Sequence, residues 1–419
     1  MDETLRRLGE QLPLIRALLT TRLSQTLFAS AAFLLVVQYG YYAIAILQSK
    51  DLILPQGPVI GGDFVVFWQA AQTPIAEIPE IYDFAEISRR LERSFPAYGE
   101  FSLGWHYPPT VFFLFAPFAG QPYLASYAAW CVFLLLFLLV VLRGLGADRR
   151  ALFFVAASPA VFQAVITGQT GFFVAGLFAL AAFAPNRRPL IAGLAAGVLT
   201  LKPQLGILLP IAFLAAGAWR AIFVAGATAI AIVVSAWFVF GVEAYAAFFD
   251  ELSRHGGRLS TPGFPFHKLT SAYGGLVNAG VPYAVAGAVQ TLTTLGVAVF
   301  VFFAWRRTDD PELRLAAAAG GVLLATPYGF YYDLPMLIAP MLIVAKRGLE
   351  RGWLPHERAF LCVLWIAPMF MPAERDPAVS EVFLVSVSAF ALVVRRVAHE
   401  TGFAEDFRFA NANAPAPAG

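Results

Sequence analysis

The chain is dominated by long apolar runs, many of which end in arginine or lysine. About 20 apolar residues in a helix are enough to cross the hydrocarbon core of a bilayer. Hydrophobic residues make up 59% of the chain and charged residues only 13%, whereas soluble domains usually carry about 25% charged residues. A soluble chain of this composition could not cover its surface with polar side chains. The sequence therefore predicts an all-α, polytopic membrane protein folded as one helical bundle, without a soluble domain of any size.

The basic clusters orient the chain, because positive residues concentrate on the cytoplasmic side of membrane proteins. They stand at Arg143 with Arg149 and Arg150, Arg187 with Arg188, Arg220, Arg306 with Arg307, Lys346 with Arg347, and Arg395 with Arg396. If each cluster is cytoplasmic, the chain has about twelve transmembrane helices and two cytoplasmic termini, and it belongs in the inner or plasma membrane of the cell. The predicted helices are 24–47, 122–143, 150–166, 170–185, 188–201, 203–218, 221–241, 282–304, 312–327, 329–345, 357–371 and 377–396.

Two longer stretches then fall on the outer side, a first loop at 48–107 and a second at 243–281. The run 108–119 is too short to span, so it enters the membrane partway or extends the next helix with a kink. Several predicted helices are also short, and the outer turns between them should lie below the membrane surface and line a cavity. We expect one transmembrane domain over residues 1–403 and a disordered cytoplasmic tail at 404–419.

Charge and cysteine content exclude several classes of function. A formal net charge of +2 argues against a nucleic-acid partner. Cys131 and Cys362 both lie in apolar runs, so neither a disulfide framework nor a thiolate metal site is expected. The histidines have no Glu or Cys at ligand spacing, which makes a zinc site an unfavourable interpretation. No cofactor is therefore expected.

Asp63 is the first candidate for chemistry, a lone acid at the predicted outer interface that follows Gly61 and Gly62. It could cap the short helix that starts at Phe64, or it could be a general base held at the interface. The glycines would let backbone or substrate approach closely. Phe64 and Trp68 offer flat faces to a sugar, although aromatic residues gather at membrane interfaces in any case.

A second aromatic segment reads Trp105-His106-Tyr107-Pro108-Pro109. Two prolines suit the first turn of a helix, where their missing N–H groups cost nothing. The segment is thus a rigid helix start in any interpretation. His106 and Tyr107 are in addition candidates for contact with a substrate.

Lys202 ends a very apolar run on the side where positive charge is disfavoured. An ionisable residue at membrane depth is a functional candidate, and the alternative is a side chain that reaches back to the interface. Gln169, Gln204 and Tyr328 lie in outer turns of the same kind, where they are candidates for substrate binding. Asp333 lies one turn inside the tenth predicted helix from its outer end and is interpreted as a partner of Lys202 or as a helix-start carboxylate.

The second outer loop is rich in cationic and titratable side chains. They are Arg254, His255, Arg258, His267 and Lys268. A solvated charge cluster is the usual explanation of such a group. With prolines that fix the path of the loop, it also suits a phosphate ligand.

Taken in order, these motifs resemble glycosyltransferase family 87, a member of the GT-C superfamily of integral-membrane enzymes. The resemblance is carried by Gly62-Asp63-Phe64, Tyr82-Asp83, Tyr107-Pro108-Pro109, Gly168-Gln169, the segment from Ala192-Gly193-Leu194 to Lys202-Pro203-Gln204, and His267-Lys268-Leu269-Thr270-Ser271. It implies an inverting enzyme that takes a hexose, usually mannose, from a polyprenyl-phosphate carrier. The acceptor would be a lipid or glycan on the outer leaflet.

In such an enzyme Asp63 would be the catalytic base. The leaving group is already a phosphate, so no general acid is needed, unlike in glycoside hydrolysis. The donor phosphate would be bound by Lys202, His267 and Lys268, with Arg254 and Arg258 behind them. Substrate contacts would come from Phe64, Trp68, His106, Tyr107, Gln169, Gln204, Tyr328 and Asp333. A divalent metal could bind Asp63 and Asp83, but the resemblance does not require one.

Other functions fit the same pattern. A secondary transporter or lipid flippase would also place broken helices and lone charges at depth, although the polar residues here cluster at one face and no internal repeat is evident. A protein O-mannosyltransferase, a ligase with a diphosphate-linked donor and a non-catalytic subunit of an envelope-assembly complex stay open.

Overall fold

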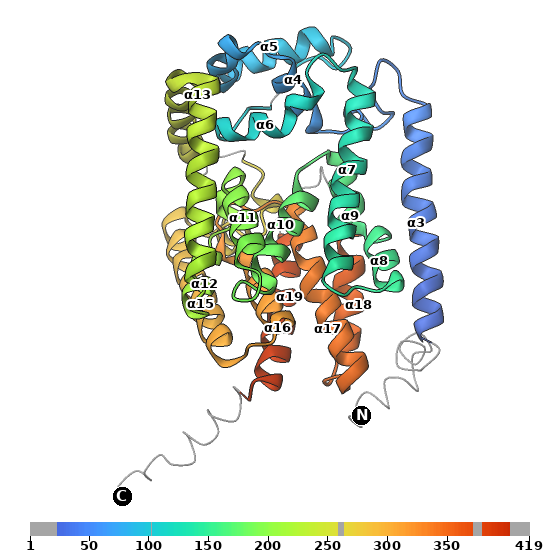
Figure 1. Ribbon diagram of the computed structural model, residues 1–419. Coiled ribbons are helices and arrows are strands. Elements are labelled where there is room, and N and C mark those ends of the chain that lie inside the picture. The colour runs from blue at the N-terminus through green and yellow to red at the C-terminus, as the bar shows by residue number, and fades with distance from the viewer. Residues whose placement is uncertain (1–22, 102, 259–263, 372–378, 403–419) are drawn as a thin grey trace, which may run out of the picture.

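The computed structural model describes residues 23–101, 103–258, 264–371 and 379–402. These residues form helices joined by turns, with isolated bridges but no β-strand among them. The all-α prediction is therefore confirmed. The helices build one bundle whose upper end, in Figure 1, is covered by a layer of short helices. The predicted tail 404–419 lies outside the described residues.

Five of the described helices are long and apolar enough to cross a membrane. They are α3 (Leu23–Leu47), α7 (Tyr123–Gly144), α13 (Trp219–Arg258), α15 (Tyr283–Arg307) and α19 (Glu381–Glu400). The pair α8 (Arg149–Ala156) and α9 (Pro159–Thr167), bent by 51° at its break, would make a sixth span. The bundle is therefore that of a membrane protein, with five or six helices of spanning length in the described part.

The other predicted spans correspond to shorter helices, because Pro or Gly interrupts each apolar run. They are α10 (Gly171–Phe183), α11 (Pro189–Val198), α12 (Leu209–Ala215), α16 (Pro311–Ala325), α17 (Ile338–Arg351) and α18 (Glu357–Ile366), with the 3₁₀ turns η4 (Leu199–Leu201), η5 (Pro203–Leu205), η7 (Tyr331–Leu337) and η8 (Ala367–Phe370). α16 is the centre of the bundle, since every residue from Leu313 to Ala325 is buried. Its small residues let α15 and α19 approach closely, as is usual between membrane helices.

The predicted first outer loop is largely helical and forms the upper layer. It contains α4 (Phe64–Gln72), η1 (Ile75–Tyr82) and α5 (Phe84–Ser94). The run 108–119 adds η2 (Pro109–Val111), α6 (Phe112–Phe115) and η3 (Ala116–Phe118), and α7 begins separately at Tyr123. The run is thus a set of short turns in the upper layer (Figure 1) rather than an extension of α7.

α13 continues well past its predicted end at residue 241. A kink at Gly241, whose φ is 80°, joins its two halves. The upper half, after the kink, packs against the upper layer, where the ring of Phe248 lies 6.0 Å from that of Tyr82. Just before the kink, the ring of Phe240 lies 5.4 Å from that of Phe112. The start of the predicted second loop is therefore helical. Its later part holds η6 (Phe266–Lys268) and α14 (Ala272–Asn278).

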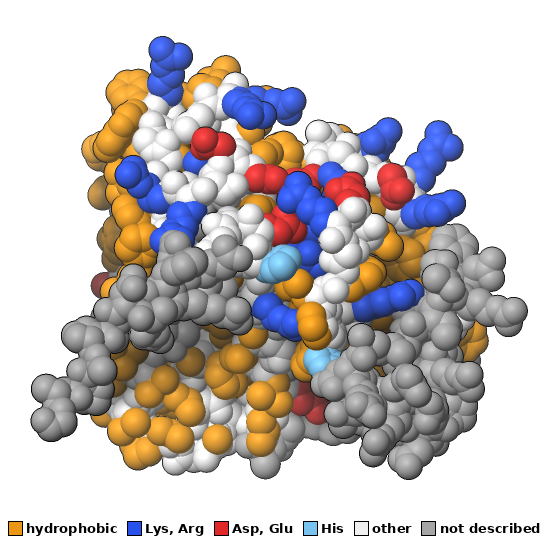
Figure 2. Space-filling view, turned by 90° about the horizontal axis from the view of Figure 1, so that it is seen from below, with side chains coloured by type: hydrophobic (Ala, Val, Ile, Leu, Met, Phe, Trp, Pro, Cys, Tyr) orange, Lys and Arg blue, Asp and Glu red, His pale blue; other side chains and the backbone are white. Residues whose placement is uncertain are grey.

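The lower end in Figure 1, which we call the basic end, holds the start of α3 and the end of α19. Figure 2 looks onto this end and shows many Lys and Arg side chains, with Asp and Glu side chains among them. Arg347 lies 2.7 Å from Asp310, and Arg396 donates from Nε to Glu357 at 2.8 Å. Ion pairs of this kind join α16, α17, α18 and α19 through the C-terminal charge cluster, which consists of Asp310, Glu312, Arg347, Glu357, Arg396 and Glu400.

Candidate active site

Two glycine turns bring Asp63 and Gln169 together. Gly61 and Gly62 have φ values of 83° and 50°, and Gly168 ends α9 at a φ of 59°. A Cβ atom on Gly168 would stand 2.5 Å from Cβ of Phe64 and 2.9 Å from the Gly61 carbonyl oxygen. Only glycine permits this approach of one turn to the other. The residues that follow the two turns, Asp63 and Gln169, therefore meet.

Asp63 occupies the N-cap position of α4, but its side chain makes no capping hydrogen bond. Instead, its carboxylate accepts a hydrogen bond of 2.7 Å from Nε2 of Gln169. Oε1 of Gln169 in turn accepts one of 3.1 Å from the Tyr107 hydroxyl. The chain Tyr107–Gln169–Asp63 fixes the amide orientation and holds the half-buried carboxylate in place.

Lys202 and Asp333 form a buried ion pair, with Nζ of the lysine 2.7 Å from Oδ1 of the aspartate. Their exposed fractions are 5% and 0%. Oδ2 of Asp333 also accepts a hydrogen bond of 3.1 Å from the backbone N–H of Phe330 at the start of η7. Asp333 is thus both the partner of Lys202 and a carboxylate at the start of a helical turn. Nζ of Lys202 lies 5.0 Å from the ring centroid of Tyr332 as well.

The charges around Asp63 oppose one another. Burial raises the pKa of the Asp63 carboxyl, while the Gln169 donor and the positive charges of Lys268 and Lys202 lower it by less. Burial also raises the pKa of Tyr107, helped by the negative charges of Asp333 and Asp63, so the phenol stays a neutral donor. These couplings place both acids and both lysines in one electrostatic neighbourhood. We call it the Asp63 site, consisting of Asp63, Tyr107, Gln169, Lys202, Lys268 and Asp333.

The backbone around Lys268 is firmly anchored. Thr270 donates from its N–H to the Gly329 carbonyl at 2.8 Å and from its hydroxyl to the Leu323 carbonyl at 2.9 Å. The Ser380 hydroxyl donates to the His267 carbonyl at 3.0 Å. Among the described residues the Lys268 ammonium forms no ion pair. Once Lys202 and Asp333 neutralise each other, the site retains one carboxylate and one ammonium group that are available to a ligand.

His106 and Arg254 gather at a different acid. Nδ1 of His106 lies 3.1 Å from Oε1 of Glu251, and Nε of Arg254 lies 3.4 Å from Oε2. Glu251 is only 3% exposed and ties the upper half of α13 to the segment before η2. Sequence reasoning missed Glu251, although its position three residues before Arg254 on a helix was a usable signal. Arg258 ends α13, and its side chain lies outside the described part.

Two predicted substrate contacts, Phe64 and Trp68, lie on α4 and pack against other parts of the protein. Phe64 is fully buried, with its ring 5.5 Å from that of Tyr127 and 6.2 Å from that of Trp130. Trp68 donates from Nε1 to the Gln121 carbonyl at 2.9 Å, and its ring meets that of Tyr123 at 5.6 Å. Neither ring is a member of the Asp63 site.

The remaining candidates are Tyr328, Gln204 and Asp83. Burial raises the pKa of Tyr328, and the negative charges of Asp333 and Asp63 raise it further. This half-buried phenol therefore lies within the electrostatic reach of both acids. Gln204 is half-buried in η5, two residues after Lys202. Asp83 caps α5, accepting hydrogen bonds of 2.9 and 3.0 Å from the N–H groups of Ala85 and Glu86. The described residues hold no group of three or more His, Cys, Asp or Glu side chains placed to bind a metal ion.

Comparison with known proteins gives one match. The sequence model of glycosyltransferase family 87 matches residues 105–327. This segment includes Tyr107, Gln169, Lys202 and Lys268, while Asp63 and Asp333 lie on either side of it. No curated protein matches the chain, and no solved structure does.

Proposed function

The chain belongs to glycosyltransferase family 87. From this membership we propose that it transfers a hexose, with mannose as the proposed sugar, from a polyprenyl-phosphate carrier to a lipid or glycan acceptor, with inversion at the anomeric carbon. One observation carries the proposal. The Asp63 carboxylate is held by Gln169 without serving as a helix cap, and it feels the positive charge of Lys268, which forms no ion pair with a described residue.

We place the protein in the inner or plasma membrane as a GT-C-type bundle of about twelve membrane-embedded helical segments, counting the short helices that do not span alone. The basic end is then cytoplasmic, in line with the positive-inside rule. Both termini lie on that side. The Asp63 site then faces the extracytoplasmic side, where the polyprenyl donor would reach it from the bilayer.

In the proposed reaction the Asp63 carboxylate takes the proton of the acceptor hydroxyl as that oxygen attacks the anomeric carbon. The bond between this carbon and the phosphate oxygen breaks, and its electron pair leaves with the polyprenyl phosphate. Attack opposite to the leaving group inverts the configuration, so a β-linked donor gives an α-linked product. General-base assistance of this kind contributes about 10²–10⁴-fold to a rate.

The cations of the site act on the departing phosphate. Its charge grows from about −1 towards −2 as the bond breaks, so a fixed ammonium group stabilises the transition state more than the ground state. Lys268 is the first candidate, because Asp333 already neutralises Lys202. His267, Arg254 and Arg258 complete the proposed phosphate-binding set, and Tyr107, Gln169, Gln204, Tyr328 and His106 the sugar-binding set.

Purified protein in detergent micelles tests this function. Incubated with a polyprenyl-phosphate donor carrying radioactive mannose and with lipid extract as acceptor, it should form an α-linked, labelled product and release polyprenyl phosphate. A diphosphate-linked donor should be inert. A transporter or flippase would give no product in micelles and would move the lipid only across sealed vesicles, which would contradict the proposal.

A further inference from the structure

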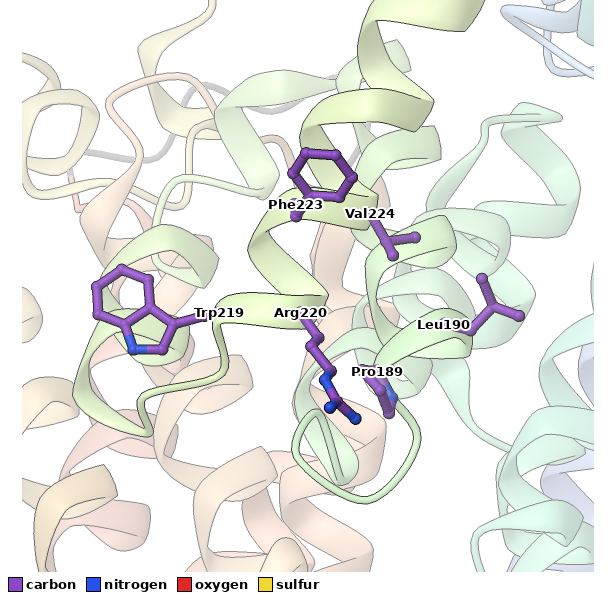
Figure 3. A pocket seen from close by; sticks show the side chains of 6 residues that line it. All are labelled: Pro189, Leu190, Trp219, Arg220, Phe223 and Val224. Atoms are coloured by element: carbon purple, nitrogen blue, oxygen red, sulfur yellow. The ribbon is translucent and has the colours of Figure 1, made fainter.

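A groove of about 420 Å³ opens at the basic end, far from the Asp63 site. It is lined by Pro189, Leu190, Trp219, Arg220, Phe223 and Val224, from the first turns of α11 and α13 (Figure 3). Three of its apolar side chains are largely exposed: Leu190 at 61%, Trp219 at 65% and Phe223 at 77%. Trp219 and Phe223 lie on α13, a helix long and apolar enough to cross a membrane, where exposed apolar side chains are expected to face lipid.

The two helices are held together directly above and beside the groove. A Cβ atom on Gly193 would stand 2.5 Å from Cβ of Val224, so the helices are in near backbone contact one turn further along. Nδ2 of Asn186 donates to the Ala216 carbonyl at 2.9 Å and joins the turns that precede α11 and α13. The groove is therefore a fixed feature of the fold.

The groove lies in a stretch of chain that has no acid of its own. No Asp or Glu occurs between Asp148 and Glu243. Arg187, Arg188 and Arg220 are exposed, and none of them forms an ion pair with a described residue. Arg347 and Arg396, at the same end of the bundle, are each paired with carboxylates. Among the described residues, unpaired positive charge thus lies beside an apolar groove.

We propose that this groove binds one anionic phospholipid of the surrounding bilayer. An acyl chain would lie along Leu190, Phe223 and Val224, and the phosphate would meet the guanidinium groups of Arg220 and the Arg187-Arg188 pair. Basic pockets between membrane helices on the cytoplasmic side recognise acidic head groups in this way. The first turns of α11 and α13 add the positive ends of two helix dipoles, and Trp219 suits the interface depth of a head group.

Native mass spectrometry of the full-length protein in detergent tests the proposal, with dioleoyl phosphatidylglycerol and dioleoyl phosphatidylcholine as probes. The wild type should retain one phosphatidylglycerol and bind phosphatidylcholine more weakly. A cationic side chain contributes about 1 kcal/mol near an anionic head group, which is about fivefold in affinity. Arg220→Gln should therefore weaken phosphatidylglycerol binding about fivefold, and the variant that also carries Arg187→Gln and Arg188→Gln should lose about a hundredfold.

Arg150→Gln is the matched control, because Arg150 is an exposed arginine of the same acid-free stretch on α8, across the bundle from the groove (Figure 1). It should bind phosphatidylglycerol like the wild type. An equal loss in this variant would show that diffuse charge alone attracts the lipid. Equal affinity for the two lipids, or unchanged binding in Arg220→Gln, would likewise overturn the proposal.

Discussion

The Asp63 site and the C-terminal charge cluster both bury charged side chains, at opposite ends of the bundle, but they differ in how these charges are matched. In the cluster, Arg347 reaches Asp310, Glu312 and Glu400, while Arg396 reaches Glu357. In the site, one pair is closed, between Lys202 and Asp333. The Asp63 carboxylate accepts a hydrogen bond from the neutral amide of Gln169 and forms no ion pair with a described residue, and neither does Lys268.

The difference separates architecture from function. A buried charge that contacts its counterion is already compensated and needs no ligand, and the pair joins the helices that carry it. Asp63 and Lys268, by contrast, are positioned by their neighbours without being neutralised in contact. An ionised group held in this manner is matched to a ligand or a transition state. The predictions below test whether the two regions can be disabled independently.

The largest expected effect on stability comes from Glu357→Gln, in the C-terminal charge cluster. Arg396 is 1% exposed, and the loss of Glu357 removes its closest counterion and leaves only the more distant Glu400, at 3.6 Å. Breaking a buried ion pair in this way costs about 3–5 kcal/mol. Thermal unfolding in detergent should therefore occur at a clearly lower temperature, with sugar transfer per folded molecule unchanged. Glu350→Gln, at an exposed position on α17, is the control and should unfold like the wild type.

Lys202→Met should affect both properties, because it strands the buried Asp333 carboxylate inside the candidate site. The expected loss of stability is about 3 kcal/mol, the lower part of the range for a broken buried pair. The double variant with Asp333→Leu should recover stability, since replacing both partners by apolar groups is often neutral. Sugar transfer should stay low in it. Full recovery of transfer would mean that the pair is purely structural.

Lys268→Met should leave unfolding unchanged, because this lysine has no ion pair to lose among the described residues. Loss of a charge-assisted contact to the phosphate costs about 1.5–3 kcal/mol, so kcat/KM for the polyprenyl-phosphate donor should fall about tenfold to a hundredfold. Lys50→Met, at an exposed position beyond the end of α3, is the matched control. Equal losses in the two variants would deny Lys268 a specific role.

The smallest effect concerns pH. A base works only when deprotonated, so kcat/KM should fall on acidification through the pKa of Asp63, which burial raises above the ordinary value of 3.8. The positive charge of Lys268 lowers this pKa, and its removal in Lys268→Met should move the acid limb of the pH–rate profile to higher pH. A shift to lower pH would contradict the proposed neighbourhood of the two groups.

Much of this organisation could be predicted from the sequence. The apolar runs indicated a helical membrane bundle, and the unexpected positions of Asp63, Lys202 and Asp333 marked them as candidates. A pairing of Asp333 with Lys202 was one of the two interpretations that the sequence offered for Asp333. These signals are local, because a charge in an apolar run has to be explained wherever the chain goes.

The rest depends on contacts between distant segments. The positive residues Arg347 and Arg396 indicated a cytoplasmic end, but nothing local showed that they are buried partners of Asp310 and Glu357. Phe64 belongs to the core because Tyr127 and Trp130 from α7 surround it. The continuation of α13 past Gly241 was hidden as well, since a glycine in an apolar run followed by polar residues is typical of a helix end.

Asp63→Asn tests the central claim most directly, with sugar transfer and thermal unfolding measured on the same preparation. The account predicts that transfer falls about 10²–10⁴-fold. Unfolding should occur at a temperature no lower than for the wild type, because a carboxyl with a raised pKa loses stability as pH rises through that pKa, and the neutral amide avoids this cost. Transfer by the Asn variant at the wild-type rate would contradict the role of Asp63 as the base.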